Sequence, residues 1–545
     1  MPAIRRRFSH HFAPILLLLL TWGTYFIVLF TRILSWRPDG LYLGSVNTWS
    51  DWALHITLAN RFALLAPKYW FASHPLYAGA PMNYPFFSDF ISGMLMRTGL
   101  SLKAAMVAPS VITALALLLL AYAVLYRLLR SAWQAVLAIS IFFLSAGYGF
   151  LHMHFSWANL LSPPLEYSRF DAYQWYSGNT IVGLLLPQRG MLLGMAWTLG
   201  ILYIVITALQ SSDISKARFK LLIAGILAGF LPIIHPHSLI ALAVFSLFLC
   251  LPRWRDWRSL IWYALPATII SLIFYKIFIA SGFHLTDFMG WHPGLGIPDF
   301  KTWISQWFYW RWGLMLPLVI LSYIALRRSY TTEARRIFQA AATLFVLASL
   351  ISFQPTFWDN SKILYWAYFF FSAMAVAVLA DMWRTGRLLK VMAVICVFLL
   401  TATGTLELIR LQRIDLNSYQ ETSSADIALG DQIRQQTDPG AVFLTANAHN
   451  DFVMIWGLRS VYLGFVSWVE NYGFPSSQRY NDSWNIYQGG AQADRLIAQD
   501  RISYVIIGPG ETYSFHPDQT YFDERFPVAF SNDSNRVYDV RSVWR

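Results

Sequence analysis

Long apolar runs separated by short polar segments dominate the first three quarters of the chain. An α-helix needs about 17–25 apolar residues to cross a bilayer. Eleven runs approach this length, and they occupy residues 12–34, 104–126, 132–151, 190–209, 219–235, 237–251, 259–280, 313–326, 337–352, 363–381 and 388–409. The runs on either side of His235-Pro236-His237 also fit one broken or bent pair. The pattern predicts an all-α polytopic membrane protein with about 11 transmembrane helices.

Residues 410–545 lose this pattern. Short runs rich in β-branched and aromatic residues alternate there with polar segments, which is typical of strands. Strands are predicted at 441–446, 459–465, 504–508 and 536–540, and helices near 424–437 and 488–500. The sequence therefore predicts two domains: a transmembrane domain, residues 1–409, with a large first outer loop at 35–103, and an extracytoplasmic α/β domain, residues 410–545.

The composition supports a membrane protein. Hydrophobic residues make up 56% of the chain and charged residues 13%, whereas a soluble domain carries about 25% charged residues. A soluble fold of this length has too little interior for so much apolar surface. Disordered chains are poor in these residues, so disorder is excluded as well.

The net charge of +12 is distributed as membrane topology requires. Six basic clusters stand between the apolar runs: Arg5–Arg7, Arg127/Arg130, Lys216/Arg218/Lys220, Arg253/Arg255/Arg258, Arg327/Arg328/Arg335/Arg336 and Arg384/Arg387/Lys390. Eleven spans with a cytoplasmic N-terminus place all six clusters in the cytoplasm, as the positive-inside rule expects. We therefore predict a multi-pass protein of the inner (cytoplasmic) membrane, with the C-terminal domain outside and no nucleic-acid partner.

The first outer loop carries the most distinctive polar residues. Asp51 and His55 are four residues apart and would share one face of a helix; His74 and Tyr84 follow downstream. A carboxylate and an imidazole at the membrane surface could take a proton from an alcohol or bind a metal. The alternative is a capping Asp and an interfacial His.

A second group of polar residues stands at the outer ends of later spans. Gln188 and Arg189 begin one span, where an Arg can grip a phosphate or extend to lipid headgroups. The preceding loop carries Glu166 and Asp171 among aromatic residues, a pattern that suits sugar rings or an interfacial belt.

Two further motifs carry ionisable groups beside apolar runs. His235 and His237 flank a proline, and such groups are costly in a membrane unless they have a function; the alternative is a polar helix break. Lys362 stands in the first turn of a predicted helix, where the macrodipole disfavours a cation. This position favours an anionic partner, or an ion pair with Asp359.

Cofactor motifs are missing from the sequence. The two cysteines lie in apolar runs, and no CxxC, Walker, GxGxxG, HExxH or GxSxG pattern occurs. No cofactor is implied with certainty, and a divalent metal stays an open alternative.

Together these residues resemble the GT-C superfamily of polytopic glycosyltransferases, which use polyprenyl-phosphate-linked sugars on the exoplasmic face. The resemblance lies in a long first outer loop with an acid soon after the first span, Asp51 within DWALH, followed by HPLYAGAPMNYP. The patterns LLPQRG, HPHS and WDNSK also resemble uncharacterised bacterial and archaeal members. The resemblance covers residues 1–410 loosely. Many members carry paired acids in this loop, whereas Asp51 stands alone, which favours single-base catalysis over a metal-dependent reaction.

The resemblance implies a hexosyl- or pentosyltransferase of the cell envelope. It would move a sugar from a polyprenyl-phosphate donor to a hydroxyl of an acceptor glycan, lipid or protein, with inversion. Asp51 would be the base and His55 would orient it. The expected substrate-binding residues are His74, Tyr84, Gln188, Arg189, His235, His237, Asp359 and Lys362.

Two other functions remain open at this point. A transporter or flippase of a lipid-linked substrate would place ionisable groups near the bilayer midplane in broken helices. A non-catalytic receptor or scaffold would use the C-terminal domain as its binding module, and its polar residues would not converge in one cleft.

Overall fold

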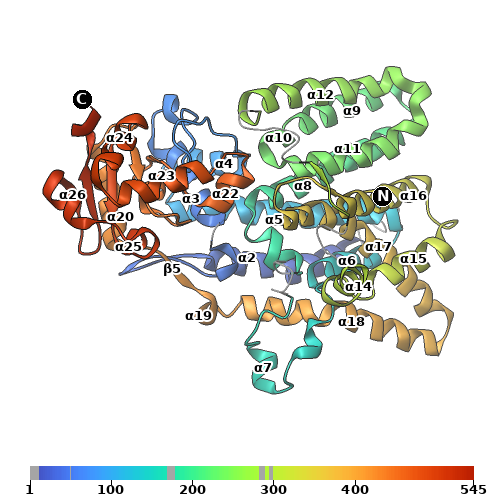
Figure 1. Cartoon of the computed structure of the whole chain (residues 1–545). Coiled ribbons are helices and arrows are strands. Elements are labelled where there is room, and N and C mark those ends of the chain that lie inside the picture. Colours follow the sequence, from blue (N-terminus) through green and yellow to red (C-terminus); the bar gives the residue numbers. More distant parts are fainter. Residues whose placement is uncertain (1–10, 50, 169–177, 281–288, 294–298, 545) are drawn as a thin grey trace. The chain divides into compact units, whose positions relative to one another are not determined.

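The computed structural model describes residues 11–49, 51–168, 178–280, 289–293 and 299–544. The basic cluster Arg5–Arg7 and the residue Asp171 lie outside them. The chain divides into two compact units (Figure 1), which are described separately. Unit 1 comprises Met1–Thr31, Ser110–Tyr275 and Met289–Asn417, and unit 2 comprises Arg32–Pro109, Lys276–Phe288 and Ser418–Arg545.

Unit 1 is built of helices, and each predicted apolar run overlaps one of them. The first run forms the helical segment His11–Arg32, which ends in α2 (Thr24–Arg32). The other runs correspond to α5 (Leu102–Leu129), α6 (Ala132–Leu144), α8 (Arg189–Leu209), α9 (Ile214–Gly229) with α10 (Leu231–Ile234), α11 (Pro236–Cys250), α12 (Trp257–Phe278), α15 (Met315–Leu326), α16 (Thr332–Leu350), α17 (Ser361–Thr385) and α18 (Arg387–Leu411). The remaining elements are α7 (Trp157–Leu161), α14 (Phe300–Ser305), α19 (Ile414–Asn417) and the antiparallel pair β3 (Gly290–Trp291) and β4 (Ile351–Ser352). The predicted break is present, because the chain leaves helical geometry at His235 between α10 and α11.

Helix α17 forms the core of unit 1. It packs against α6, α11, α15, α16 and α18. Of its most apolar 18-residue window, 94% is buried. Its apolar run has no polar face, as expected for a helix with neighbours on every side.

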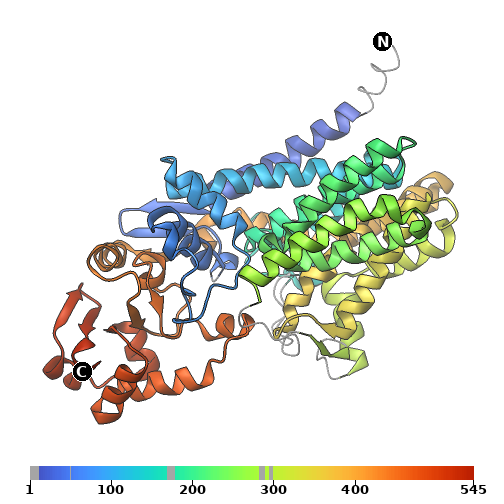
Figure 2. The ribbon, with the colours of Figure 1, turned by 90° about the horizontal axis from the view of Figure 1, so that it is seen from above.

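Helices α9, α11 and α12 run side by side (Figures 1 and 2). Small residues allow the closest of these approaches: a Cβ atom on Gly225 of α9 would stand 2.4 Å from the carbonyl oxygen of Tyr263 on α12. Gly229, one turn later, meets Ile270 in the same way. Such small-residue contacts let helix backbones pack closely where the solvent is lipid.

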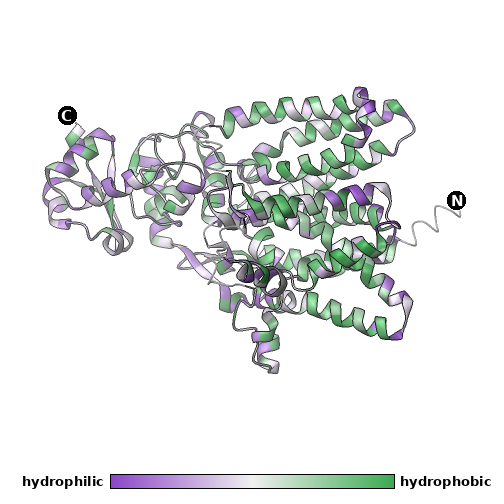
Figure 3. Cartoon of the chain, turned by 45° about the vertical axis from the view of Figure 1, so that its right-hand side comes forward, coloured by the Kyte–Doolittle hydropathy of each residue, from purple (hydrophilic) through white to green (hydrophobic). Residues whose placement is uncertain are grey.

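The long helices of unit 1 consist mainly of hydrophobic residues (Figure 3). Leu265, Ile269 and Leu272 of α12 are 53%, 47% and 60% exposed. An exposed apolar surface of this extent is stable against lipid tails but not against water. Seven helices of the described residues are long and apolar enough to cross a membrane, and α6 and α15 are shorter apolar helices. The count of eleven spans stays a prediction.

Unit 2 joins the first outer loop to the C-terminal tail through a sheet. Strands β1 (Leu34–Arg37) and β2 (Gly40–Leu43) form a hairpin, and β5 (Tyr419–Ser423) pairs antiparallel with β2. Strand β2 begins directly after the hairpin turn at Gly40, which has φ +150°, and a Cβ atom there would stand 2.2 Å from the carbonyl oxygen of Thr422. The close pairing of β2 with β5 therefore requires this glycine.

The rest of the first loop folds into two packed helices, α3 (Asp51–Leu64) and α4 (Phe87–Arg97). Helix α3 is buried from Trp52 to Phe62. Gly93 of α4 permits the contact, since a Cβ atom there would stand 2.5 Å from the Cβ atom of Phe62. The tail also contacts α3, because Asn60 donates a hydrogen bond to the carbonyl oxygen of Ile455 at 3.0 Å.

The tail forms the predicted α/β structure. Its helices are α20 (Ser424–Gln436), α21 (Phe452–Ile455), α22 (Val466–Asn471), α23 (Ser477–Tyr487), α24 (Gly490–Gln499), α25 (Pro509–Phe515) and α26 (Gln519–Arg525), and its strands are β6 (Val442–Leu444), β7 (Ser460–Val461), β8 (Tyr504–Ile507), β9 (Val528–Ser531) and β10 (Arg536–Asp539). The five strands lie in the order β7-β6-β8-β10-β9, in which β6 is parallel to β7 and β8 and β10 is antiparallel to its neighbours. Ile433, Phe443 and Val537 are among the residues of its core. All four predicted strands and both predicted helices are confirmed.

The boundary between the two units differs from the predicted domain boundary at residue 409. The first outer loop and the tail share unit 2, because β5 extends the β1–β2 hairpin and α3 contacts α21. The assignment of 1–409 and 410–545 as functional domains stays a prediction.

Candidate functional site

The N-terminal ends of α8, α11 and α17 lie together in unit 1. A Cβ atom on Gly194 of α8 would stand 2.6 Å from the Cβ atom of His235, the residue that precedes α11. Trp366 of α17 donates a hydrogen bond from Nε1 to the hydroxyl of Ser238 on α11 at 3.2 Å. Three helix N-termini with their partial positive charge therefore surround one region of the unit.

Gln188 and Arg189 stand at the start of α8. Gln188 is the N-cap residue, and both side chains are buried, at 8% and 3% exposure. The Nε atom of Arg189 lies 3.4 Å from the hydroxyl of Ser110. A buried side chain of this kind does not extend to the lipid headgroups.

His235 and His237 are buried at the start of α11. Nδ1 of His235 caps the helix by accepting a hydrogen bond from the backbone N–H of Ser238 at 3.2 Å, and it lies 2.8 Å from the Ser238 hydroxyl. Nε2 of His235 has no hydrogen-bond partner among the described residues. The ring of His237 lies 5.4 Å from that of His235. The imidazole of His235 thus caps α11 through Nδ1.

Lys362 is the second residue of α17, and its positive charge is close enough to interact with His235 and His237. Its Nζ atom is 2.6 Å from Oδ1 of Asp359, which is buried. The predicted ion pair is therefore present, and it holds the ammonium group in the first turn of α17. Because Asp359 offsets part of this positive charge, an anion bound at the start of α17 would be held chiefly by other cations.

One such cation is Arg311, which the sequence analysis missed. It is buried at 8% exposure and lies within electrostatic range of Tyr365 on α17, one turn after Lys362. In the sequence Arg311 stands in the run QWFYWRWG. Nothing in this run distinguishes it from an arginine at the membrane interface. Its relation to α17 comes from tertiary packing alone.

A substitution on α8 tests this packing. We expect Gly194→Ala to destabilise unit 1 by about 1–3 kcal/mol, because the added methyl group overpacks the contact with His235. Thermal unfolding in detergent measures the effect. Gly200→Ala on the same helix is the matched control, since its nearest neighbours stand 3.7 Å away, and it should leave the melting temperature unchanged. Equal melting temperatures for the two variants would contradict the close contact.

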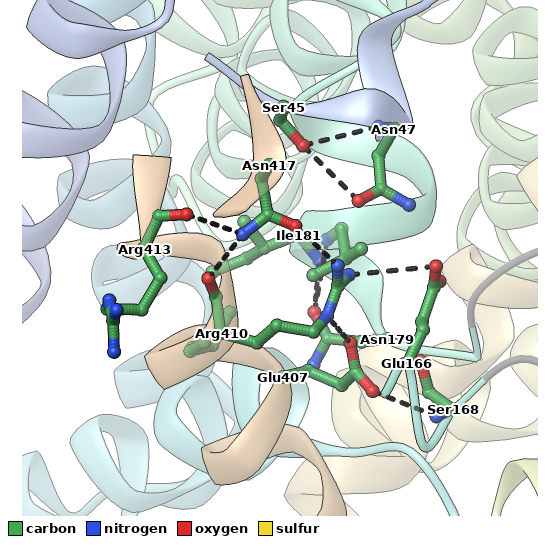
Figure 4. Close-up of polar contacts among 12 residues, drawn as sticks. Ser45, Asn47, Glu166, Ser168, Asn179, Ile181, Glu407, Arg410, Arg413 and Asn417 are labelled. Atoms are coloured by element: carbon green, nitrogen blue, oxygen red, sulfur yellow. Dashed lines mark hydrogen bonds and ion pairs between the residues drawn. The ribbon is translucent and has the colours of Figure 1, made fainter. Parts of the chain in front are cut away.

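A second polar network connects the end of α18 with the loop that carries Glu166 and Ser168 (Figure 4). Glu407 is fully buried, accepts a hydrogen bond from the backbone N–H of Ser168 at 3.0 Å, and lies 3.2 Å from Nε of Arg410. Arg410 also donates to Asn417 at 2.8 Å and lies 3.6 Å from Glu166. Glu166 is thus part of an ion-pair network that fixes the loop.

We expect Arg410→Ala to cost about 3–5 kcal/mol of stability, because it removes the guanidinium that two carboxylates share and leaves the buried carboxyl group of Glu407 without this partner. The melting temperature and the protease resistance of the loop should both fall. Arg413→Ala is the matched control, because Arg413 pairs with Asp415 at the surface, and it should change neither. A stable Arg410 variant would show that the network is dispensable.

In unit 2, Asp51 opens α3 and is partly exposed, whereas His55 is buried at 1%. The hydrogen-bond partner of His55 is Asp89 on α4: Nδ1 lies 2.8 Å from Oδ2. The predicted role of His55 in orienting Asp51 is not tested by this contact. The His55–Asp89 pair instead ties α3 to α4 and so fixes the helix that carries Asp51.

Tyr84 and His74 lie in the same unit. The ring of Tyr84 stands between those of His55 and Tyr472, at 6.2 Å and 5.5 Å. His74 is buried, and its Nδ1 accepts a hydrogen bond from the backbone N–H of Leu76 at 3.2 Å. Burial and the nearby Arg61 lower the pKa of His74 to about 3, so its ring is neutral. His74 therefore stabilises a turn of the loop, and its contact with substrate stays a prediction.

The predicted site residues thus form two groups. Gln188, Arg189, His235, His237, Asp359 and Lys362 gather in unit 1, and Asp51, His55, His74 and Tyr84 belong to unit 2. Their meeting in one cleft stays a prediction. Within the described part of the chain, no three His, Cys, Asp or Glu side chains come together as metal ligands, and we derive no step through a metal.

No protein-family model matches the sequence, and no curated protein matches it significantly. Several solved structures match the fold of the chain. The archaeal oligosaccharyltransferase AglB from Archaeoglobus fulgidus, in complex with an inhibitory peptide and a dolichol-phosphate, aligns with a TM-score of 0.53 and 12% identity over 93% of this chain and 70% of AglB. AglB in complex with Zn and sulfate aligns with the same score and identity over 96% and 73%. ArnT from Cupriavidus metallidurans in the apo state gives 0.47 and 12% over 97% and 98%.

AglB is an oligosaccharyltransferase that binds a dolichol-phosphate in the first of these structures. This chain therefore shares the overall fold of AglB. At this identity the likeness concerns the fold, and the function must be argued from the residues.

Proposed function

We propose that the protein is an integral-membrane glycosyltransferase. It moves a hexosyl or pentosyl group from a polyprenyl-phosphate donor to an acceptor hydroxyl on the outer face of the cytoplasmic membrane. The observation that carries the proposal is the proximity of the N-terminal ends of α8, α11 and α17, which carry Arg189, His235 and Lys362. Among the described residues, Nε2 of His235 has no hydrogen-bond partner.

This arrangement suits a phosphodiester at the membrane boundary. Helix N-termini bind phosphate through their unpaired N–H groups and dipoles, and an Arg fork adds directed hydrogen bonds. The phosphodiester of the donor headgroup would bind at these helix ends while its polyprenyl chain stays in lipid.

Asp51 is the proposed base. It is partly exposed at the head of a buried helix that His55 and Asp89 fix, which suits a carboxylate that must meet a substrate in a defined position. Asp51 would take the proton of the acceptor hydroxyl as the oxygen attacks the anomeric carbon. The bond between that carbon and the phosphate oxygen breaks, and its electron pair leaves with the polyprenyl phosphate. In-line attack inverts the anomeric carbon.

The leaving phosphate gains negative charge in this step. Arg189, with Lys362 and His235, would stabilise that charge in a site where little water is present. The donor is already activated, so the reaction needs no nucleotide. The acceptor is a glycan, lipid or protein hydroxyl.

The positions of buried charges favour this function over transport. In unit 1 the described buried Asp, Glu, Lys and Arg residues lie at helix ends: Arg189, Arg311, Asp359, Glu407 and Arg410. Transporters place such groups near the bilayer midplane in broken helices.

The test is transfer by purified protein in lipid nanodiscs. Radiolabelled polyprenyl-phosphate sugars are supplied with a membrane lipid and glycan extract, and both labelled product and released polyprenyl phosphate are measured. We expect the two to appear in equal amounts. Passage of intact donor across proteoliposomes, with no cleavage of the sugar-phosphate bond, would instead establish a flippase.

A further inference from the structure

A cavity of about 520 Å³ lies in unit 1 at the C-terminal end of α8. Its volume is within the range of about 300–1,000 Å³ that is typical of small-molecule sites. Residues of α5, α8 and α9 and the C-cap residue of α8 line it: Arg127, Tyr203, Ile204, Thr207, Gln210 and Lys220. Arg189 begins the same 21-residue helix, about 30 Å away. The cavity is therefore separate from the proposed donor site.

Side-chain contacts between α5 and α8 hold Arg127 at the wall of this cavity. Arg127 stands in the last turn of α5, and its Nη1 atom donates a hydrogen bond to Oε1 of Gln210 at 2.9 Å. Its guanidinium carbon lies 5.1 Å from the centre of the Tyr203 ring, within the range of a cation–π contact. The bond to Gln210 uses one of the five N–H donors of the guanidinium. Arg127 is thus fixed in position and still able to bind an acceptor.

The charge of the cavity has one sign. Its lining includes the cations Arg127 and Lys220 and no acidic residue among those described. The acid nearest in the connecting loop, Asp213, lies 3.3 Å from Lys216 instead. Within the part of the chain that the structure describes, neither Arg127 nor Lys220 forms an ion pair with Asp or Glu. Two such cations favour an anionic ligand, and the planar fork of an arginine matches a phosphate.

The position of the cavity favours a phosphate that belongs to a lipid. Helices α5, α8 and α9 with α10 are each long and apolar enough to cross a membrane. Leu119 stands eight residues before Arg127, on the same face of α5, and is 43% exposed. Ile112, seven residues earlier, is 66% exposed. An exposed apolar face thus leads along α5 to the two cations, as an acyl chain would lead to its headgroup.

We propose that this cavity binds the phosphate of an anionic phospholipid from the predicted cytoplasmic leaflet. Basic pockets between transmembrane helices bind such headgroups, and both cations belong to clusters that the positive-inside rule places in the cytoplasm. Arg127 would hold the phosphate oxygens through its fork, and Lys220 would add a second positive charge. The lipid would connect α5 with α8 and α9. Its binding does not depend on sugar transfer.

Native mass spectrometry of the purified full chain in detergent tests the proposal. The protein is titrated with phosphatidylglycerol or with phosphatidylcholine, which has no net charge. We expect phosphatidylglycerol to bind more tightly, and Arg127→Gln and Lys220→Gln each to weaken its binding about fivefold, the contribution of one cation near an anionic lipid surface. Binding of phosphatidylcholine should not change. Equal affinity of the wild type for the two lipids would overturn the proposal.

Arg130→Gln is the matched control. Arg130 belongs to the same basic cluster as Arg127, but it is exposed and does not line the cavity. Its replacement removes the same charge and should leave the affinity for phosphatidylglycerol unchanged. An equal loss in Arg130→Gln and Arg127→Gln would show attraction to surface charge in general and would contradict a defined site.

Inorganic phosphate distinguishes a lipid headgroup from a soluble anion. It lacks the acyl chains that would lie on the face of Leu119, so it should not displace phosphatidylglycerol at equal concentration. Displacement at equal concentration would assign the cavity to a soluble anion and overturn the lipid proposal.

A second measurement uses the wild type alone and does not depend on the folding of a variant. Lysine acetylation is followed by peptide mass spectrometry in nanodiscs of phosphatidylcholine with and without phosphatidylglycerol. Lys220 should react several-fold more slowly when phosphatidylglycerol is present, because the headgroup covers it. Lys216, whose side chain is 77% exposed, should change little. Equal changes at the two lysines would refute the site.

Discussion

Asp51→Asn should lower kcat about 10²–10⁴-fold, the range for loss of a general base, and leave the donor KM close to that of the wild type. The amide occupies the same volume but cannot take the acceptor proton. Because Asp51 belongs to unit 2 and the proposed phosphate residues to unit 1, the variant should still bind polyprenyl phosphate. Initial rates of transfer at varied donor concentration measure both parameters.

Asp39→Asn is the matched control for this substitution. Asp39 lies in the exposed turn of the β1–β2 hairpin and accepts a hydrogen bond from Tyr42. It is an acid of the same outer loop, so a general loss of negative charge would affect both variants equally. We expect wild-type kinetics from Asp39→Asn. Comparable activity in both variants would remove Asp51 from the mechanism.

The sequence predicted the helices and the strands of the tail well, because both depend on local pattern. Apolar runs of bilayer length have few structures available other than a helix, and the Pro between His235 and His237 marks the end of α10 and the start of α11. The β-branched and aromatic residues of 504–508 and 536–540 identified β8 and β10, which pair with each other.

Partners that are distant in the sequence could not be predicted in this way. Strand β5 pairs with β2 across about 380 residues of chain, as in Gly40 with Ser423, and nothing in either segment specifies the other. Asp89 as partner of His55 and Arg311 as neighbour of Tyr365 depend on how helices pack.

The group of predicted site residues in unit 1 depends both on local sequence pattern and on helix packing. Lys362 in the first turn of a predicted helix and the histidine pair beside apolar runs were unusual positions in the sequence. For each, a purely structural role was the alternative to ligand binding. The structure realises those alternatives, an ion pair with Asp359 and a helix cap by His235. The ion pair and the helix cap also bring Lys362 and His235 to adjacent helix ends, so these structural roles are compatible with the proposed binding roles.

Arg189→Gln should lower kcat/KM for the donor about 10²–10³-fold, the range for removing one donor to a developing oxyanion. Gln retains polar contact with Ser110 but carries no charge. Binding of polyprenyl phosphate alone should weaken as well, in contrast to Asp51→Asn, and isothermal titration in nanodiscs measures it. Arg189→Lys should give an intermediate loss, because it keeps the charge and loses the planar fork.

Arg255→Ala is the control for this variant, since Arg255 is an exposed cation between α11 and α12, and its removal should change neither binding nor transfer. A change of melting temperature in Arg189→Gln is checked separately, because the side chain is buried. If Arg189→Gln binds polyprenyl phosphate as tightly as the wild type, the convergence of α8, α11 and α17 is a packing arrangement and the phosphate must bind elsewhere. If binding falls and the Asp51 variant still binds, the donor and base functions are separable.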